Sequence, residues 1–221
     1  TDAGETAIEQ AELTYRLTPN LNAKVGLMLI PMGFLNESHE PPVYYGVERN
    51  EVETRIIPST WREGGFSLKG ETEIALTWQA GVSTGFNAAQ FDNAGKPLGS
   101  MRQTMSKAKA SDPSFFAALN YRGVPGFLVG ASVFTGKSAQ GNAEFKADPT
   151  KLDLNGADGL ITIYDLHSRW QGNGLDVQVL YAQGTIGDAL KIDQAIDTFN
   201  IANPGSKLPY MPAKFSGWYG Q

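Results

Sequence analysis

Few side chains in this sequence are placed to do chemistry. The two histidines, His39 and His167, lie far apart, and neither a G-x-S-x-G nucleophile motif nor a glycine-rich phosphate loop occurs. In the stretch NESHE, Glu37, His39 and Glu40 could bind a divalent ion, but a hydrated acidic loop is the commoner explanation of such a cluster. We therefore expect no enzymatic activity, no cofactor and no metal ion.

His167 stands in an alternating segment that also contains Asp165 and Arg169. Histidine changes its charge near neutral pH, so in a channel wall this residue could make conductance depend on pH. A polar residue of a water-filled lumen is the simpler interpretation.

The composition is that of a folded chain rich in strands and turns. The 221 residues are 41% hydrophobic, contain 25 glycines and no cysteine, and carry a formal net charge of -5. The acidic balance argues against nucleic acid as a partner, and the lack of cysteine excludes disulfides while being compatible with a periplasmic or surface location. The longest apolar run, residues 25–34, is much shorter than the roughly 20 residues of a membrane-spanning helix. The opening residues TDAGETAIEQ lack the pattern of a signal peptide, so we expect a mature form or an internal piece of a longer protein.

Alternating apolar and polar residues predict nine strands, joined in a regular rhythm. The strand candidates are residues 7–17, 22–32, 62–70, 73–86, 114–122, 126–136, 159–170, 174–184 and 213–221. Short turns follow the first, third, fifth and seventh strands, and long connections follow the second, fourth, sixth and eighth. Residues 100–110 and 188–199 are expected to form short helices within these connections.

This rhythm predicts an all-β, transmembrane antiparallel β-barrel, because outer-membrane barrels have short periplasmic turns and long outer loops. A soluble all-β protein with several inserted loops is the alternative, although long loops are uncommon in compact domains. The strands support the barrel: in GLDVQVLYAQG, Leu175, Val177, Val179 and Tyr181 share one face, which would meet lipid. The opposite faces of the strands predict the pore-lining residues Glu12, Arg16, Lys24, Glu73, Arg122, Asp165, His167, Arg169 and Asp176.

Residues 26–65, GLMLIPMGFLNESHEPPVYYGVERNEVETRIIPSTWREGG, combine a strand that ends in Pro-x-Gly, a loop rich in proline, tyrosine and glutamate, and a strand that opens WREGG. This stretch resembles the outer-membrane porins grouped with the phosphate- and pyrophosphate-selective porins O and P. The resemblance implies a large barrel of the bacterial outer membrane, commonly of about sixteen strands and often trimeric, with membrane lipid and lipopolysaccharide around it. Small hydrophilic solutes or ions would diffuse through it passively.

The sequence departs from that family in two respects. It has nine predicted strands and ends GWYGQ without a terminal aromatic residue, so we expect residues 1–221 to form a single, partial barrel domain that lacks strands at both ends. The positions before the Pro-x-Gly turn are Met28, Leu29 and Ile30 rather than basic residues, so phosphate selectivity is not carried over. A general or weakly cation-preferring pore is expected instead.

The loop of residues 33–61 could fold inward and narrow the pore. Its constriction residues would then be Glu48, Arg49, Glu51, Glu53 and Arg55. Two other functions stay open. A secreted all-β module could bind carbohydrate through exposed aromatic residues such as Tyr44, Tyr45 and Trp61, and a barrel with a plugged lumen could serve as a scaffold or adhesin.

Overall fold

The computed structural model describes residues 8–105 and 107–221, and within them the chain forms one antiparallel sheet of nine strands. The strands are β1 Ala11–Thr18, β2 Leu21–Leu29, β3 Arg62–Glu71, β4 Leu76–Ser83, β5 Ser114–Val124, β6 Phe127–Gly136, β7 Ile161–Gly172, β8 Leu175–Ile186 and β9 Lys214–Gly220. The helices are α1 Ala143–Ala147 and α2 Ala189–Ala202, with short helical turns η1 Pro41–Val43, η2 Val52–Ile56, η3 Ala88–Gln90 and η4 Gln140–Asn142. None of the helices in the described ranges is long and apolar enough to cross a membrane.

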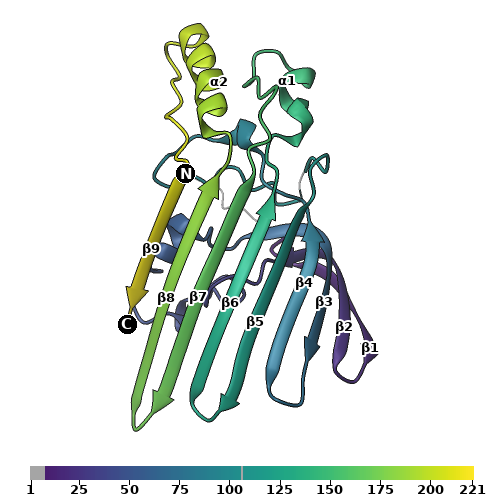
Figure 1. Ribbon diagram of the computed structural model, residues 1–221, viewed down its shortest axis with the longest axis vertical. Helices are drawn as coiled ribbons and strands as arrows, with labels where there is room; N and C mark the ends of the chain where they lie inside the picture. Colours follow the sequence, from purple (N-terminus) through teal and green to yellow (C-terminus); the bar gives the residue numbers. More distant parts are fainter. Residues whose placement is uncertain (1–7, 106) are drawn as a thin grey trace, which may run out of the picture.

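Each strand pairs with its neighbours in sequence, in the order β1 to β9 (Figure 1). The all-β, antiparallel prediction is therefore confirmed. The sheet is not closed on itself: among the described residues, the outer edges of β1 and β9 have no partner strand.

All short turns lie at one end of the sheet and all long loops at the other (Figure 1). The turn between β7 and β8 is Asn173-Gly174, and both residues have positive φ angles, 51° and 77°. Asn-Gly with this geometry is a favoured two-residue hairpin connection because its twist matches that of the strands. The predicted rhythm of short turns and long loops is thus present in the fold.

Several strand boundaries and one helix of the sequence prediction are wrong. The strands expected over 22–32 and 73–86 end at Leu29 and Ser83, and the first expected strand begins at Ala11, with residue 7 outside the described residues. The strand expected from residue 73 begins at Leu76, because residues 73–75 belong to the turn after β3. The helix expected over 100–110 is absent from the described part of that span, which excludes residue 106. There the Gln103 side chain donates to the carbonyl oxygens of Gly85 (2.8 Å) and Lys109 (2.9 Å) and accepts from the Lys109 N–H (2.6 Å). These bonds satisfy the backbone of an irregular loop, which outweighs the weak preference of a short segment for a helix.

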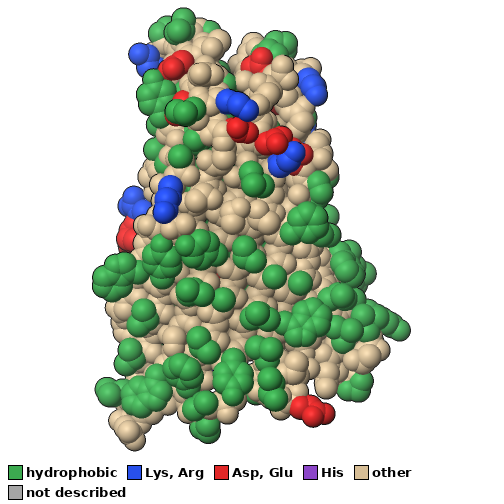
Figure 2. Space-filling view, in the orientation of Figure 1, with side chains coloured by type: hydrophobic (Ala, Val, Ile, Leu, Met, Phe, Trp, Pro, Cys, Tyr) green, Lys and Arg blue, Asp and Glu red, His purple; other side chains and the backbone are tan. Residues whose placement is uncertain are grey.

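The sheet has an apolar exposed face, here called the outer surface. Leu13, Val25, Phe66, Val82 and Phe115 pair in turn across β1 to β5, so they share this face. The outer surface comprises Leu13, Tyr15, Val25, Phe66, Val82, Phe115, Leu119, Val129, Val133, Leu166, Trp170, Val177, Val179 and Trp218, all exposed. In Figure 2 hydrophobic side chains are spread over the strands of this surface, and charged groups lie mainly over the loops.

The opposite face, called the inner surface, is covered by the loop of residues 30–61. Val177 on the outer surface is 44% exposed, whereas its neighbour Gln178 is 3% exposed. Buried residues of this loop, Met32, Val52, Ile57 and Trp61, pack with inner-surface residues such as Phe134, Ile163 and Leu180 in one core. In Figure 1 the loop runs behind the strands, so part of the core lies between the sheet and this loop, and the other long loops and α2 supply the rest.

Candidate functional site: the loop within the curve of the sheet

The loop leaves β2 through Pro31-Met32-Gly33 and turns back over the inner surface. Gly33 has φ +65°, and a Cβ atom there would collide with Glu53 Oε1. Glycine is the residue that adopts this conformation without steric cost. The Gly33 N–H donates to Asp165 Oδ2 on β7 at 3.1 Å. The Pro-x-Gly turn noted in the sequence is therefore the point at which the loop is fastened to the sheet.

Glu53 fixes the middle of the loop. Its carboxylate is 1% exposed and accepts hydrogen bonds from the N–H groups of Phe34 (2.6 Å) and Leu35 (2.7 Å). It also accepts from Asn50 Nδ2 (3.1 Å) and from the Tyr219 hydroxyl of β9 (2.5 Å). A buried charge is tolerated only when it is well hydrogen-bonded, and this one is. Glu53 is thus an internal anchor and does not face an open lumen as a constriction residue would.

Asp165 and His167, two residues apart on β7, both point to the inner surface. His167 Nδ1 lies 2.6 Å from Asp165 Oδ1 and His167 Nε2 lies 2.8 Å from Asn120 Oδ1. Ser132 donates to Asp165 Oδ2, and the ring of Phe34 meets the His167 ring edge-on with centroids 4.8 Å apart. Because Ser132 bonds to the carboxylate and not to the imidazole, the group has no serine positioned for activation by histidine. The network holds the start of the loop, at Gly33 and Phe34, against β7.

A cavity of about 320 Å³ remains between the loop and the short-turn end of β5 to β8. Arg122, Arg169 and Gln178 line it together with Phe34 and Leu35. Arg169 is held in place by two bonds to Asp176, at 2.8 and 2.5 Å. The structure thus brings two of the predicted pore-lining residues, Arg122 and Arg169, to the wall of this cavity, and a third, Asp176, is the partner of Arg169.

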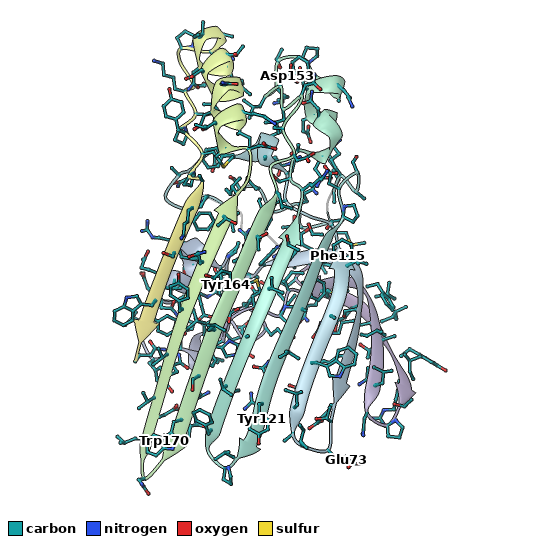
Figure 3. All side chains as sticks on the ribbon, in the orientation of Figure 1. Glu73, Phe115, Tyr121, Asp153, Tyr164 and Trp170 are labelled. Atoms are coloured by element: carbon teal, nitrogen blue, oxygen red, sulfur yellow. The ribbon has the colours of Figure 1, made fainter. Side chains whose placement is uncertain are left out.

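The other predicted pore-lining residues are spread more widely. Glu12 and Lys24 form an ion pair of 2.7 Å across β1 and β2 on the inner surface. Arg16 lies on the same face and is exposed. Glu73 sits in the turn after β3, at the short-turn end of the sheet (Figure 3), so it does not line an interior.

The remaining charges of the loop lie at its surface. Glu48, Glu51 and Arg55 are exposed, and Glu51, which immediately precedes η2, pairs with Arg55 inside it. Arg49 donates to Ser59 (2.9 Å), Thr60 (3.0 Å) and the His39 carbonyl oxygen (2.8 Å), which joins the two arms of the loop.

The aromatic residues proposed for carbohydrate binding do not form one exposed platform. Trp61 is fully buried and packs against Phe86 and Phe134, with ring centroids 4.9 and 4.5 Å away. The expectation that Trp61 is exposed is therefore wrong. Trp61 is the last residue of the loop before β3, and loop residues are usually exposed. Here the loop folds over the Trp61 side chain and buries it.

Three residues that hold the loop were not identified from the sequence. Asn36 donates to the carbonyl oxygens of Ile30 and Trp61 (both 2.8 Å), and Glu63 accepts from the Trp61 Nε1–H at 3.3 Å. Tyr219 is the partner of Glu53. Tyr219 and the exposed Trp218 are neighbours on the last strand, so their side chains point to opposite faces of the sheet. This alternation could have assigned Tyr219 to the inner surface, whereas no local pattern marks Asn36 or Glu63.

At the loop end of the sheet, Asp188 joins the start of α2 to the loop between β6 and β7. Its carboxylate accepts from the Asp158 N–H (2.9 Å) and contacts Lys191 Nζ (3.1 Å), and these bonds lower its pKa below the ordinary 3.8. A carboxyl group whose pKa is lowered by folding stabilises the folded state above its unfolded pKa, and this contribution is lost as pH falls through the lowered value.

We therefore expect Asp188→Asn to increase amide exchange at Asp158 several-fold near pH 6, where the wild-type contact is fully formed. In the wild type the same protection should disappear only on acidification below about pH 4. Hydrogen exchange read by mass spectrometry checks this, with Asp197→Asn, which loses only its bond to Tyr210, as the control. Unchanged exchange at Asp158 would show that the bond is not needed to hold the loop.

Comparison with known proteins gives one informative match. The chain is 31% identical, over all 221 residues, to an uncharacterized protein of Aquifex aeolicus (strain VF5). It spans 47% of that protein's length. No family model matches the chain, and no solved structure matches it.

Proposed function

We propose that this chain forms part of the wall of a porin-like, transmembrane β-barrel in the bacterial outer membrane. Small hydrophilic solutes or ions would diffuse passively through its interior, past the loop of residues 30–61. Membrane lipid and lipopolysaccharide would surround the outer surface.

The observation that carries the proposal is the polarity of the two faces. In a soluble protein the apolar face of a sheet is buried and the polar face is solvated. Here the apolar outer surface is exposed, whereas Asp165, Ser132 and Gln178 on the inner surface are buried. Nine strands at about 4.8 Å spacing and about 20 Å of strand length give an apolar area of roughly 800 Å². Soluble monomers rarely expose contiguous apolar patches of more than a few hundred Å².

The dimensions of the strands support a membrane location. β5, β7 and β8 contain 11 or 12 residues, and a tilted transmembrane strand needs about 9–11. Aromatic residues stand at two levels: Phe115 and Tyr164 nearer the loops, and Tyr121 and Trp170 near the short turns (Figure 3). Six residues separate the levels on each strand, or about 20 Å, similar to the apolar band of about 25 Å that aromatic girdles flank in outer-membrane barrels.

A closed barrel would need more strands along the outer edges of β1 and β9, since the nine-stranded sheet is open. The Aquifex relative, of which this chain spans about half, is long enough to include them. The loop would then narrow the lumen, and the cavity lined by Arg122 and Arg169 would open toward the short-turn end.

Spin labels on single cysteines test which solvent each face meets, because the chain has no other cysteine. Val129 on the outer surface pairs with Tyr121, next to Arg122 on the inner surface, so the two sites lie at nearly the same depth. In bilayers we expect a label at Val129 to be accessible to oxygen and a label at Arg122 to be accessible to a water-soluble nickel complex.

Nickel access at Val129 as high as at Arg122 would contradict the proposal, because it would place the outer surface in water. Planar-bilayer recordings then separate an open pore from a barrel whose loop seals it as a scaffold or adhesin. Stepwise conductance is expected, and its absence in a correctly inserted protein would favour the sealed barrel.

A further inference from the structure

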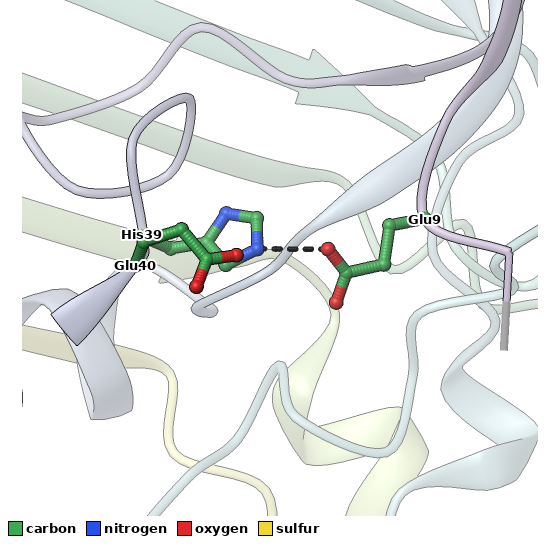
Figure 4. Close-up of side chains that lie close together, drawn as sticks. All are labelled: Glu9, His39 and Glu40. Carbon is green, nitrogen blue, oxygen red and sulfur yellow. Dashed lines mark hydrogen bonds and ion pairs between the residues drawn. The ribbon is translucent and has the colours of Figure 1, made fainter. Parts of the chain in front are cut away.

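Three potential metal ligands meet where the segment before β1 approaches the loop of residues 30–61 (Figure 4). His39 and Glu40 come from the NESHE stretch, and Glu9 comes from the segment that leads into β1. One side-chain ligand atom of each lies within 4.8 Å of the others. The structure therefore adds Glu9, which the sequence did not suggest, to a cluster that omits Glu37.

The hydrogen bonding of His39 determines which of its nitrogen atoms faces this cluster. The residue is 8% exposed, and its Nδ1 lies 3.1 Å from the Asn36 carbonyl oxygen. A carbonyl oxygen can only accept, so Nδ1 carries the proton. In the neutral ring Nε2 then has a free electron pair, and it points at Glu9 Oε2, 3.0 Å away.

In this arrangement two hydrogen-bond acceptors, His39 Nε2 and Glu9 Oε2, face each other. A neutral imidazole nitrogen and a carboxylate oxygen attract each other only if a proton or a metal cation lies between them. Glu40 adds a second carboxylate, and among the described residues no lysine or arginine lies within 4.0 Å of the Glu9 or Glu40 carboxylates. Metal-bound histidines usually donate their other ring N–H to a carbonyl or carboxylate, as His39 does to Asn36.

We propose that Glu9, His39 and Glu40 bind a divalent first-row transition metal ion, for which Zn²⁺ is the test case. One imidazole nitrogen with two carboxylate oxygens suits Zn²⁺ better than Ca²⁺ or Mg²⁺, which prefer oxygen ligands alone. Tetrahedral zinc ligands lie about 3.4 Å apart. The exposed Glu9 and Glu40 side chains can close the present spacing by rotation, and water would complete the coordination.

The bound ion would tie the segment before β1 to the loop on the inner surface. This site is independent of the proposed pore function, since it requires only the fold. Binding can therefore be measured without any conductance reading.

The test is a competition titration of the purified chain in detergent micelles with ZnCl₂ and a chromophoric zinc chelator. The variants are Glu9→Gln, Glu40→Gln and His39→Gln, and the matched control is Glu37→Gln, an exposed glutamate of the same stretch outside the cluster. We expect each cluster variant to weaken Zn²⁺ binding about tenfold or more and the control to bind like the wild type.

Glu9→Gln and Glu40→Gln change exposed side chains, so they remain informative if His39→Gln fails to fold. The proposal would be overturned if the wild type retained no Zn²⁺ against the chelator, which would leave a proton between His39 and Glu9. It would also be overturned if Glu37→Gln weakened binding as much as Glu9→Gln and Glu40→Gln.

Discussion

Replacing Glu53 with alanine is expected to lower the free energy of unfolding by about 3–5 kcal/mol and to release the loop from the inner surface. The substitution removes the acceptor of the Phe34 and Leu35 N–H groups and of the Tyr219 hydroxyl. Each buried donor left without a partner costs about 1–3 kcal/mol, and part of this is recovered when the loop moves and admits water. Urea unfolding in micelles, followed by tryptophan fluorescence, to which the buried Trp61 contributes, measures the loss.

Two further variants show whether the effect belongs to Glu53. Glu53→Gln keeps an oxygen for Phe34 and Leu35 but turns an amide toward the Asn50 amide, so its effect should be smaller. Glu48→Ala removes an exposed glutamate of the same loop and should change stability by no more than about 0.5 kcal/mol. Equal losses for Glu53→Ala and Glu48→Ala would mean that the loop is not anchored through Glu53. In the proposed pore, release of the loop should also increase single-channel conductance.

Leu166→Arg is expected to destabilise the protein in bilayers by about 2–4 kcal/mol. Leu166 is 57% exposed at the centre of β7, between Ala131 and Tyr181 on the neighbouring strands. If the outer surface faces hydrocarbon, the guanidinium must exchange water for lipid, which carries a large desolvation cost. Unfolding by guanidinium chloride from lipid vesicles measures the difference.

The matched control is Leu190→Arg. Leu190 is also leucine and is 80% exposed, but it lies on α2 beyond the loop end of the sheet (Figure 1). Its substitution should change stability by no more than about 0.5 kcal/mol. If both arginine variants unfold like the wild type, the outer surface faces water and the membrane proposal fails.

The regular part of the fold was predictable because its signals are local. Alternation of apolar and polar residues has a period of two in any strand, so it indicates both the strands and their faces before any partner is known. Asn173-Gly174 marked a tight hairpin for the same local reason. The helix expected at 188–199 appears as α2 over Ala189–Ala202.

The errors lie where distant residues compete with a local preference. Residues 100–110 favour a helix by composition, but Gln103 bonds to Gly85 and Lys109 and holds this segment in an irregular loop. Glu73 looked like the start of a strand and lies in a turn.

Local sequence patterns were enough to predict an antiparallel, all-β chain with short turns at one end, long loops at the other and one apolar face on each strand. Long-range packing, which those patterns do not contain, folds the loop of residues 30–61 onto the inner surface. It also buries Glu53 and Trp61 there and brings Glu9 to His39. The contacts responsible join Gly33 to Asp165 and Glu53 to Tyr219, residues 132 and 166 positions apart. Such contacts depend on the path of an irregular loop across a sheet, and an irregular path produces no repeating pattern in the sequence from which it could be predicted.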